Sequence, residues 1–403
     1  MNEPLNTVDI TFPENWKLDN LKNITKINQG LQIAISERFL EKVEGSYFYL
    51  TNEFLRSGSK KKFYILNPSK SVLCNEDDIL MTRTGNTGQV VTGVNGAFHN
   101  NFFKIKWDKT ILDKGFLYYF LTSYQTQRLI LKYAGTSTIP DLNHSDFYRI
   151  EILLPPLKEQ QKIAQILSQW DEAIETTQNL ITQLQLRKKG LMQELLSGKK
   201  RLAGFSDEWV EKSLDELFIP IQAINDGGDH EPLSISAGKG FISQKQKFDR
   251  IIAGTSLKKY TQLKKGDFAY NKGNSKSYKM GCIYLLENFE TALVPFVFIS
   301  FRPTDKVFSS FFKYFFINHG LDRQLKKIIT SGARGDGLLN VSKKDFFKLN
   351  IPFPKLKEQK AIGLILEVVD EEINTSSQHL ESLKHQKKGL MQQLLTGQKR
   401  VKF

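Results

Sequence analysis

The chain has 403 residues, of which 40% are hydrophobic and 11% aromatic, and this composition is typical of folded domains and excludes a disordered protein. A single hydrophobic core rarely supports this length, so more than one domain is expected. Its 57 lysine and arginine residues outnumber 43 aspartate and glutamate residues, giving a net charge of +14. Such a charge indicates a nucleic-acid partner, with a basic protein that binds no nucleic acid as the alternative.

Cysteine content and hydropathy argue against a disulfide-rich, zinc-binding, secreted or membrane-spanning protein. Cys74 and Cys282 stand far apart without a CxxC motif, so neither a disulfide framework nor a zinc site is predicted. The first residues lack the charged and apolar regions of a secretion signal, and the longest apolar run, at 292–301, is too short to cross a bilayer. We therefore expect a soluble, cytoplasmic protein.

Residues 1–155 are predicted to form a mixed α/β head. The runs "SYFYL" and "KKFYIL" indicate short strands, and residues 114–133 have the pattern of an amphipathic helix. Two polar loops follow such elements, "TRTGNTGQ" at 82–89 and "AGTSTIPDLN" at 134–143. Arginine, asparagine, serine and threonine can read base edges and phosphates, although most polar loops are merely solvated.

Residues 156–204 are predicted to form one long helix. Apolar residues recur at alternating steps of four and three, the pattern of a heptad seam, from Ile163 to Leu195. Pro155 precedes the helix and Gly198 follows it, as expected of helix ends. The helix should contain about 40 residues and measure about 60 Å.

Residues 205–353 are predicted to form a second α/β head. Its opening "FSDEWVEKSL" matches "FPENWKLDNL" near the start of the chain, with Trp209 in the place of Trp16. Strand-like "GCIYLL" and a helical pattern at 309–329 again accompany polar loops, "NKGNSKSYK" at 271–279 and "SGARGDGLLN" at 331–340. The loops therefore recur at corresponding places, but with different residues.

Residues 354–403 repeat the first helix at an offset of 199 positions, and about half of residues 155–201 are identical to their counterparts. We expect the two helices to pair as an antiparallel coiled coil and to give the chain an internal pseudo-two-fold symmetry. The alternative is that each helix packs separately on its own head. Polar residues interrupt both seams at the same two positions, either to fix the register or because another subunit replaces the partner helix there: Thr177, Ser376, Lys188 and Lys387.

Motifs for catalysis are missing from the sequence. No phosphate-binding GxxxxGK[ST] loop occurs, and the six histidines contain no i, i+4 pair suited to a metal. Glu358 and Lys360 resemble half of a nuclease motif, but Gln161 replaces the lysine in the other copy. We interpret this segment as an exposed helix start, and predict neither catalytic nor metal-binding residues.

The order of head, helix, head and helix, with "LPPLKEQQKIA" and "KKGLMQELLSGKKR" and their copies, resembles the DNA specificity subunit of a type I restriction-modification system. The resemblance covers essentially the whole chain, and the repeated helix motifs are its specific part. It implies target recognition domains at 1–155 and 205–353, and helices at 156–204 and 354–403 that act as spacer and docking surface. Each head would read one half of an asymmetric, bipartite DNA target.

The resemblance also implies partners and cofactors. Two modification subunits would dock on the helices and methylate adenine with S-adenosylmethionine, and restriction subunits would use ATP and Mg²⁺. The chain itself would bind no cofactor and catalyse nothing. Two alternatives remain from the residues alone, namely a scaffold that dimerises partner proteins through its helices and an enzyme with an unrecognised site.

Candidate site residues follow from the loops and the seams. Those predicted to bind DNA are Lys60, Lys61, Lys62, Arg83, Thr84, Asn86, Thr136, Ser137, Thr138, Lys272, Asn274, Lys276, Lys279 and Arg334. Within this set, the lysines at 60–62 are predicted to contact phosphates, which adds salt dependence without sequence choice. Those predicted to bind partners are Leu167, Trp170, Ile174, Leu184, Leu191, Leu366, Val369, Ile373, Leu383 and Leu390.

Overall fold

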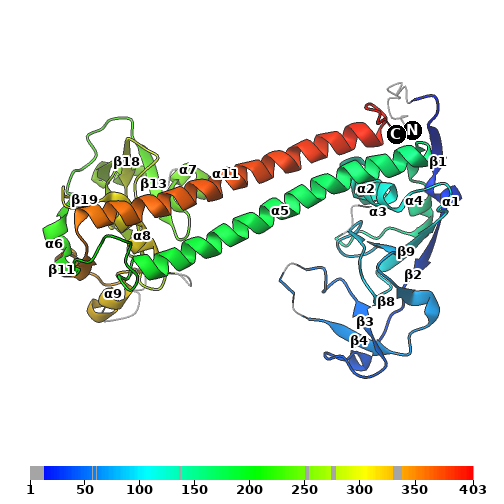
Figure 1. Cartoon of the computed structure of the whole chain (residues 1–403), viewed down its shortest axis with the longest axis horizontal. Helices are drawn as coiled ribbons and strands as arrows, with labels where there is room; N and C mark the ends of the chain where they lie inside the picture. Colours follow the sequence, from blue (N-terminus) through cyan, green and yellow to red (C-terminus); the bar gives the residue numbers. More distant parts are fainter. Residues whose placement is uncertain are drawn as a thin grey trace. The chain divides into compact units, whose positions relative to one another are not determined.

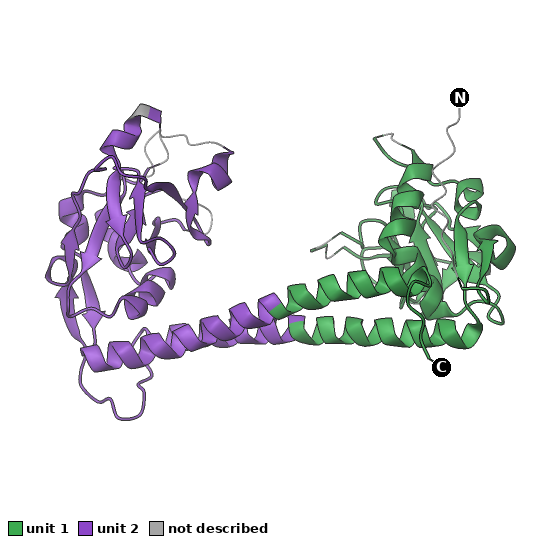
Figure 2. Cartoon of the chain, turned by 90° about the horizontal axis from the view of Figure 1, so that it is seen from above, with its two compact units in different colours: residues 1–177, 379–403 green, residues 178–378 purple. Residues whose placement is uncertain are grey.

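Two compact units make up the chain (Figure 2): unit 1 is Met1–Thr177 with His379–Phe403, and unit 2 is Gln178–Gln378. The computed structural model describes residues 13–56, 58–59, 61–135, 138–249, 254–273, 278–329 and 338–402. Figure 1 labels two long helices, α5 (Leu157–Leu195) and α11 (Leu356–Leu395), and each contributes one section to either unit (Figure 2). We call residues 13–155 head 1 and residues 205–353 head 2.

Head 1 combines short strands with helices. Its strands are β1 (Lys17–Asn20), β2 (Thr25–Gln29), β3 (Ser46–Leu50), β4 (Phe63–Leu66), β5 (Leu73–Cys74), β6 (Ile79–Thr82), β7 (Val90–Val91), β8 (Gly96–Phe98), β9 (Phe102–Trp107) and β10 (Glu151–Leu154). Its helices are α1 (Leu21–Ile24), α2 (Lys114–Thr122), α3 (Tyr124–Ala134) and α4 (His144–Tyr148), with 3-10 turns at Ile35–Glu37 and Lys70–Val72. Two four-stranded sheets have the orders β2-β9-β6-β7 and β4-β3-β8-β5, and β1 pairs with β10.

Head 2 has the same kinds of element. Its strands are β11 (Val210–Ser213), β12 (Phe218–Pro220), β13 (Glu231–Ser236), β14 (Gly240–Ser243), β15 (Thr261–Lys264), β16 (Phe268–Asn271), β17 (Cys282–Leu285), β18 (Thr291–Val294), β19 (Ile299–Pro303) and β20 (Asn350–Phe353). Its helices are α6 (Leu214–Leu217), α7 (Gln244–Phe248), α8 (Ser309–Ile317), α9 (Asp322–Ile328) and α10 (Lys343–Phe347), with a 3-10 turn at Gly254–Lys259. The sheets have the orders β12-β19-β16-β17 and β14-β13-β18-β15, and β11 pairs with β20.

Strand by strand, the two heads have the same topology. In each, one parallel pair, β3 with β8 or β13 with β18, lies in an otherwise antiparallel sheet. The terminal strands of each head, β1 with β10 and β11 with β20, pair antiparallel and bring its two ends together. The predicted α/β heads are confirmed, and the shared topology shows that the duplication includes the heads although their sequences have diverged.

Each run predicted as a single helix in the heads is two helices. Ser123 separates α2 from α3 because its extended backbone ends the first helix, while its hydroxyl accepts a hydrogen bond from the Thr126 amide and caps the second. In head 2, His319 has a positive φ of 60° between α8 and α9. In each head, a polar residue thus ends the first helix, although the apolar pattern of the sequence continues into the second helix.

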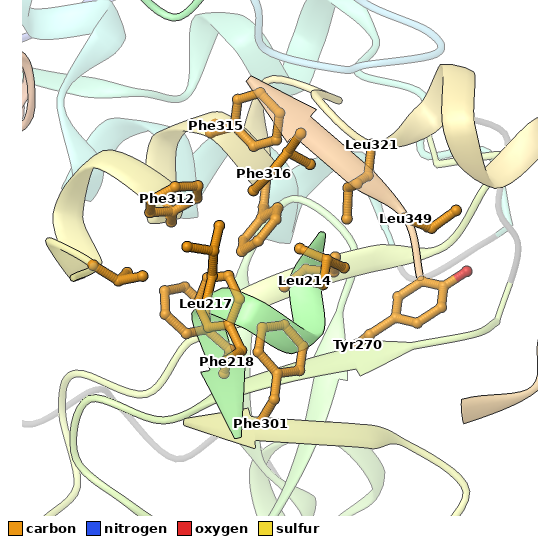
Figure 3. Close-up of a cluster of buried hydrophobic side chains, with 14 of the residues drawn as sticks. Leu214, Leu217, Phe218, Tyr270, Phe301, Phe312, Phe315, Phe316, Leu321 and Leu349 are labelled. Atoms are coloured by element: carbon orange, nitrogen blue, oxygen red, sulfur yellow. The ribbon is translucent and has the colours of Figure 1, made fainter. Parts of the chain in front are cut away.

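The core of head 2 is rich in aromatic side chains from three strands and one helix (Figure 3). Phe218 of β12 contacts Phe301 of β19 and Phe312 of α8 edge to face, with ring centroids 5.1 and 5.5 Å apart. Phe268 of β16 stacks on Phe301 at 5.5 Å. These rings fix α8 against the sheet, because offset and edge-to-face pairs stabilise beyond the area they bury.

Within unit 1, the start of α5 and the end of α11 run antiparallel and share the core of head 1. Ile163 and Leu167 of α5 lie in one buried cluster with Leu394 and Leu395 of α11 and with Phe116 of α2. In unit 2, residues of the α5 end and the α11 start, among them Leu195 and Ile362, join the core of head 2 in the same way. The predicted antiparallel pairing is confirmed within each unit.

The helices also pack on heads, which the sequence offered only as the alternative to pairing. The start of each long helix continues directly from the last strand of its own head, and the other helix ends beside it. Contacts therefore group each head with sections of both helices. The domain boundaries predicted at residues 155, 204 and 353 separate segments that pack against each other in space. These boundaries stay a prediction.

Two glycines follow the long helices where a side chain would not fit. Gly198 has φ of 69°, and a Cβ atom there would lie 3.3 Å from the Trp209 ring. Gly397 has φ of 73°, and its Cβ would lie 2.7 Å from Pro13. By contrast, Gly190 and Gly389 are helical with nothing within 4 Å.

We predict that Gly198→Ala lowers the free energy of unfolding by roughly 1–2 kcal/mol, because a left-handed backbone disfavours any Cβ. The matched control Gly190→Ala should raise the free energy of unfolding by about 0.5–1 kcal/mol, since alanine favours a helix interior. Urea unfolding of the full chain measures both. Equal unfolding midpoints for the two variants would contradict the role of Gly198.

Candidate DNA interface and its anchors

A buried glutamate anchors head 1 to both helices. Glu159 in the first turn of α5 is 0% exposed and accepts two hydrogen bonds from Arg400, at 2.6 and 2.8 Å. Trp16 of head 1 donates a third, from Nε1 at 3.2 Å. The same hydrogen bonds raise the pKa of Arg400 further above its ordinary value. One carboxylate therefore joins the head, the start of α5 and the segment that follows α11.

Unit 2 repeats this anchor with its own residues. Glu358, 1% exposed, accepts hydrogen bonds from Arg201 at 2.6 and 2.7 Å and from Trp209 at 3.0 Å. The prediction that Glu358 belongs to an exposed helix start is wrong. It failed because the ion pair that makes burial possible is formed with Arg201, which lies 157 positions earlier in the chain and has no local pattern linking it to Glu358.

The glutamine after each anchoring glutamate ties the helix start to the head. Gln160 donates to the carbonyl oxygens of Ile111 and Pro155 at 2.9 and 2.8 Å, and accepts from the Asp113 amide at 2.9 Å. Gln359 makes the corresponding three bonds in unit 2. The repeated "KEQ" is thus a structural motif, in which the glutamate binds the arginine that follows the other helix and the glutamine binds the backbone of the head.

The lysines that interrupt the heptad seams are paired with aspartates. In unit 2, Lys188 Nζ lies 2.5 Å from Asp370, which also accepts a hydrogen bond from Tyr314 at 2.7 Å. Burial and this hydrogen bond raise the pKa of Tyr314, so the phenol stays neutral and donates. In unit 1, Lys387 pairs with Asp171, which accepts from Tyr119 at 2.8 Å. Each set links both helices to α2 or α8 of the head.

The two polar loops of head 1 lie side by side. Thr84 forms a β-bridge with Asp141, and the Thr87 hydroxyl donates to the Pro140 carbonyl at 2.6 Å. Asn52, from the β3 end, donates to the carbonyl oxygens of Thr84 and Gly85 at 2.7 and 3.0 Å. The loops thus form one surface.

Head 2 joins its corresponding loops by the same device. Gly273 forms a β-bridge with Leu338, and the Leu339 amide donates to the Lys272 carbonyl at 2.9 Å. The topology of both heads therefore brings together loops that are about 50 to 65 residues apart in the sequence, as expected of a combined recognition surface. We call each pair of joined loops a bridged loop pair.

The structure distinguishes among the residues predicted to bind DNA in head 1. Asn86 is exposed, at the turn of its loop, with φ of 55°. Arg83 is already paired with Asp141 at 2.6 Å and its side chain is only 20% exposed. Thr84 also donates to Asp141. Asp141 was missed as a site residue because its role depends on a contact 58 positions away.

Other predicted DNA-binding residues lie at the surface. Lys61, Lys62, Thr138 and Lys279 are exposed, and Lys61 lies 4.0 Å from Glu53. Lys272 is half-buried and donates to the Val341 carbonyl at 3.5 Å, so its side chain supports the bridged loop pair of head 2. Six predicted residues lie outside the described part of the chain: Lys60, Thr136, Ser137, Asn274, Lys276 and Arg334.

The residues predicted to bind partners differ in exposure. Leu167, Leu366 and Val369 are buried at 0–1% exposed, inside their own units, and so offer no surface to another subunit. Leu184 is 9% exposed. Six others are half-buried along the helices: Trp170, Ile174, Leu191, Ile373, Leu383 and Leu390. For these the partner role stays a prediction.

The described part of the chain contains neither a cysteine that is ionised at neutral pH nor a cluster of side chains that could bind a metal ion. Cys74 and Cys282 are buried and free, and burial raises the pKa of both thiols to about 11, which keeps them protonated at neutral pH. Among the described residues, no three histidine, cysteine, aspartate or glutamate side chains gather where they could hold a metal ion. No helix in the same ranges is long and apolar enough to cross a bilayer.

These features define a class of protein in which two modules of one topology, with different surface loops, are anchored on duplicated long helices. The chain belongs to the family of type I restriction-modification DNA specificity subunits. The family model described as "Type I restriction modification DNA specificity domain" matches it twice, over residues 13–186 and 207–385. Each match includes one head and most of the long helix that follows it.

Similar proteins extend over nearly the same length. The specificity subunit of the type I restriction enzyme MjaVIII from Methanocaldococcus jannaschii is 29% identical, and the alignment covers 98% of this chain and 95% of that protein. The MjaIX specificity subunit from the same organism is 24% identical over 97% and 95%. The crystal structure of an S subunit from M. genitalium, 19% identical, shares the fold with a TM-score of 0.58 over 98% of both chains.

We predict that Arg400→Met destabilises the chain by roughly 3 kcal/mol, because it leaves the buried Glu159 carboxylate without its cation. Adding Glu159→Gln to that variant should recover part of the loss, since the buried charge is then removed. The control Lys384→Met breaks an exposed pair with Glu381 on the same helix and should change the free energy of unfolding by under about 0.5 kcal/mol. Equal effects of the two single variants, in thermal or urea unfolding, would refute the anchor.

Proposed function

We propose that this chain selects the DNA sequence for a type I restriction-modification complex, with each head reading one half of an asymmetric, bipartite target. The observation that carries the proposal is the pair of bridged loops in each head. The two heads place these loops at the same positions in one topology, yet the loops have unlike sequences, "TRTGNTGQ" and "NKGNSKSYK". Loops of different sequence on the same fold can bind two different half-site sequences. The net charge of +14 favours binding to the negatively charged phosphate backbone.

In this proposal the long helices set the number of unspecified base pairs between the two halves. Continuous helices of 39 and 40 residues run through both units, and the anchors fix each head to them. Two heads that approach the same face of a duplex require a spacing related to its repeat of about 10 base pairs. The anchors supply the stiffness that such a measurement needs.

The helices also serve in this proposal to dock two modification subunits. Support comes from apolar side chains left exposed on the helix sections of unit 2, where Leu180, Leu364 and Val368 are 50–55% exposed. Leu180 and Val368 also line a shallow hollow of about 420 Å³, together with Leu184 and Ser376. Exposed apolar side chains grouped on paired helices favour a protein partner.

The chemistry belongs, in this proposal, to the partner subunits. The modification subunits bind S-adenosylmethionine and methylate adenine in each half-site, and restriction subunits bind ATP and Mg²⁺. The chain contributes sequence choice and spacing and has no catalytic residue of its own. A scaffold that merely dimerises partners is the competing function, and the bridged loop pairs of the heads favour DNA reading over it.

The first test is methylome sequencing of a host that expresses the chain with its modification subunit, compared with a host that expresses the modification subunit alone. We expect one new asymmetric motif, with two short halves around a fixed gap and methyladenine on opposite strands. Formation of a complex that binds S-adenosylmethionine but methylates no new motif would reject DNA reading and favour the scaffold.

A second prediction separates base contacts from phosphate contacts in head 1. Asn86→Gly keeps the left-handed backbone but removes the amide, so it should relax one position of one half-site at a cost of about 1–3 kcal/mol in discrimination. Lys61→Ala should leave the motif unchanged and reduce the slope of log affinity against log salt by about 0.9. Binding titrations at several salt concentrations measure both. The reverse pattern would show that the two roles are wrongly assigned.

A further inference from the structure

A cluster of one exposed aromatic ring and two cations lies where head 1 meets α11. Tyr124, the first residue of α3, is 58% exposed. Lys388 of α11 places its Nζ 4.9 Å from the centroid of the Tyr124 ring, and the Arg128 guanidinium carbon lies 5.8 Å from the same centroid. We call Tyr124, Arg128 and Lys388 the α3 cation patch.

Neither cation of the patch is neutralised within the described part of the chain. No aspartate or glutamate of these residues forms an ion pair with Arg128 or Lys388, and both side chains are exposed. The neighbouring Lys387 differs, because it is paired with Asp171 and its side chain is only 18% exposed. Two cations held around one ring repel each other, and the electron-rich face of the ring offsets only part of that cost. An anion that binds between them would remove the repulsion.

The patch lies beside one loop of the bridged loop pair of head 1, because Gln127, next to Arg128 in α3, donates to the Gly88 carbonyl of the 82–89 loop at 2.8 Å. α3 runs from Tyr124 to Ala134, and the segment after it contains Asp141, which bridges to Thr84. An 11-residue helix is about 16 Å long, close to five base pairs of duplex at 3.4 Å each. A duplex held by the loops therefore has phosphates within reach of the patch, outside the half-site itself.

The corresponding place in unit 2 has cations but no aromatic ring. Lys189 is the counterpart of Lys388, and Lys326 is the fifth residue of α9, as Arg128 is of α3. However, α9 begins with Asp322, which pairs with His319 at 3.0 Å, where α3 begins with Tyr124. The ring that holds the two cations is thus a property of head 1. Lys189 consequently provides a matched control at the same position of the other repeat.

We propose that the α3 cation patch binds the phosphodiester backbone of the unspecified DNA beside the half-site of head 1. The proposal rests on the proposed function, because it assumes a duplex held by the bridged loop pair. The lysine of α11 then contacts DNA directly, so the helix pair takes part in binding the gap as well as setting its length. The patch adds affinity and salt dependence without sequence choice.

The test is a salt titration of the complex of the full chain with its modification subunits, bound to duplex carrying the motif found by methylome sequencing. Because each lost phosphate contact reduces the slope of log affinity against log salt by about 0.9, we expect Arg128→Gln with Lys388→Gln to reduce it by about 1–2. The methylated motif should not change. Lys189→Gln, the matched control, should leave the slope within error of the unsubstituted chain.

Two results would overturn the patch while leaving the proposed function intact. One is an unchanged slope in the double variant although the unsubstituted chain binds its motif. The other is loss of assembly with the modification subunits in the double variant but not in Lys189→Gln, which would assign the patch to an acidic protein surface. Failure of the unsubstituted chain to specify any motif would instead reject the proposed function, and the patch with it.

Discussion

The ion pair between a buried glutamate at the start of one long helix and a half-buried arginine beyond the end of the other is the constraint on which each unit depends. Removing a carboxylate from water costs several kcal/mol, and only a well-placed cation with further hydrogen bonds offsets that cost. Glu159 and Glu358 each have a bidentate arginine and an indole donor. If a head moved relative to the helix sections of its unit, the arginine and indole would separate from the glutamate and leave its buried charge unpaired. The anchor therefore fixes one position of each head on these helix sections.

The other contacts of each unit agree with that geometry. The glutamine after the glutamate holds the backbone of the head, the glycine after the helix allows the tryptophan to approach, and the seam lysine meets an aspartate and a tyrosine. Heptad seams are usually apolar, and a polar residue in one specifies register at a cost in stability. Here the seam lysines Lys188 and Lys387 also contact tyrosine rings of the heads. Helix pairing and head placement are therefore one cooperative structure.

The anchors and the bridged loop pairs use different residues, which explains how the loop sequences of the two heads could diverge. The anchors use the starts of the repeated helices, the segments that follow these helices and the tryptophan just before the first strand of each head, whereas the bridged loop pairs begin at the ends of β6 and β16. Loop residues can change without disturbing a buried ion pair. The pairing of Arg83 with Asp141 shows that the loops have internal order of their own, which reduces the entropy lost on binding.

The sequence by itself determined the duplication, the two long helices with their ends, the α/β character of the heads and the positions of the polar loops. Each of these follows from local periodicity, turn residues or direct repetition. Only the tertiary structure decided that Glu358 is buried, that Lys188 and Lys387 bind aspartates, that Arg83 is held by Asp141 and that Leu167 and Leu366 lie inside the heads' cores. These roles depend on contacts between residues that are far apart in the chain. The packing of helices and strands brings those residues together, and no local sequence pattern indicates it.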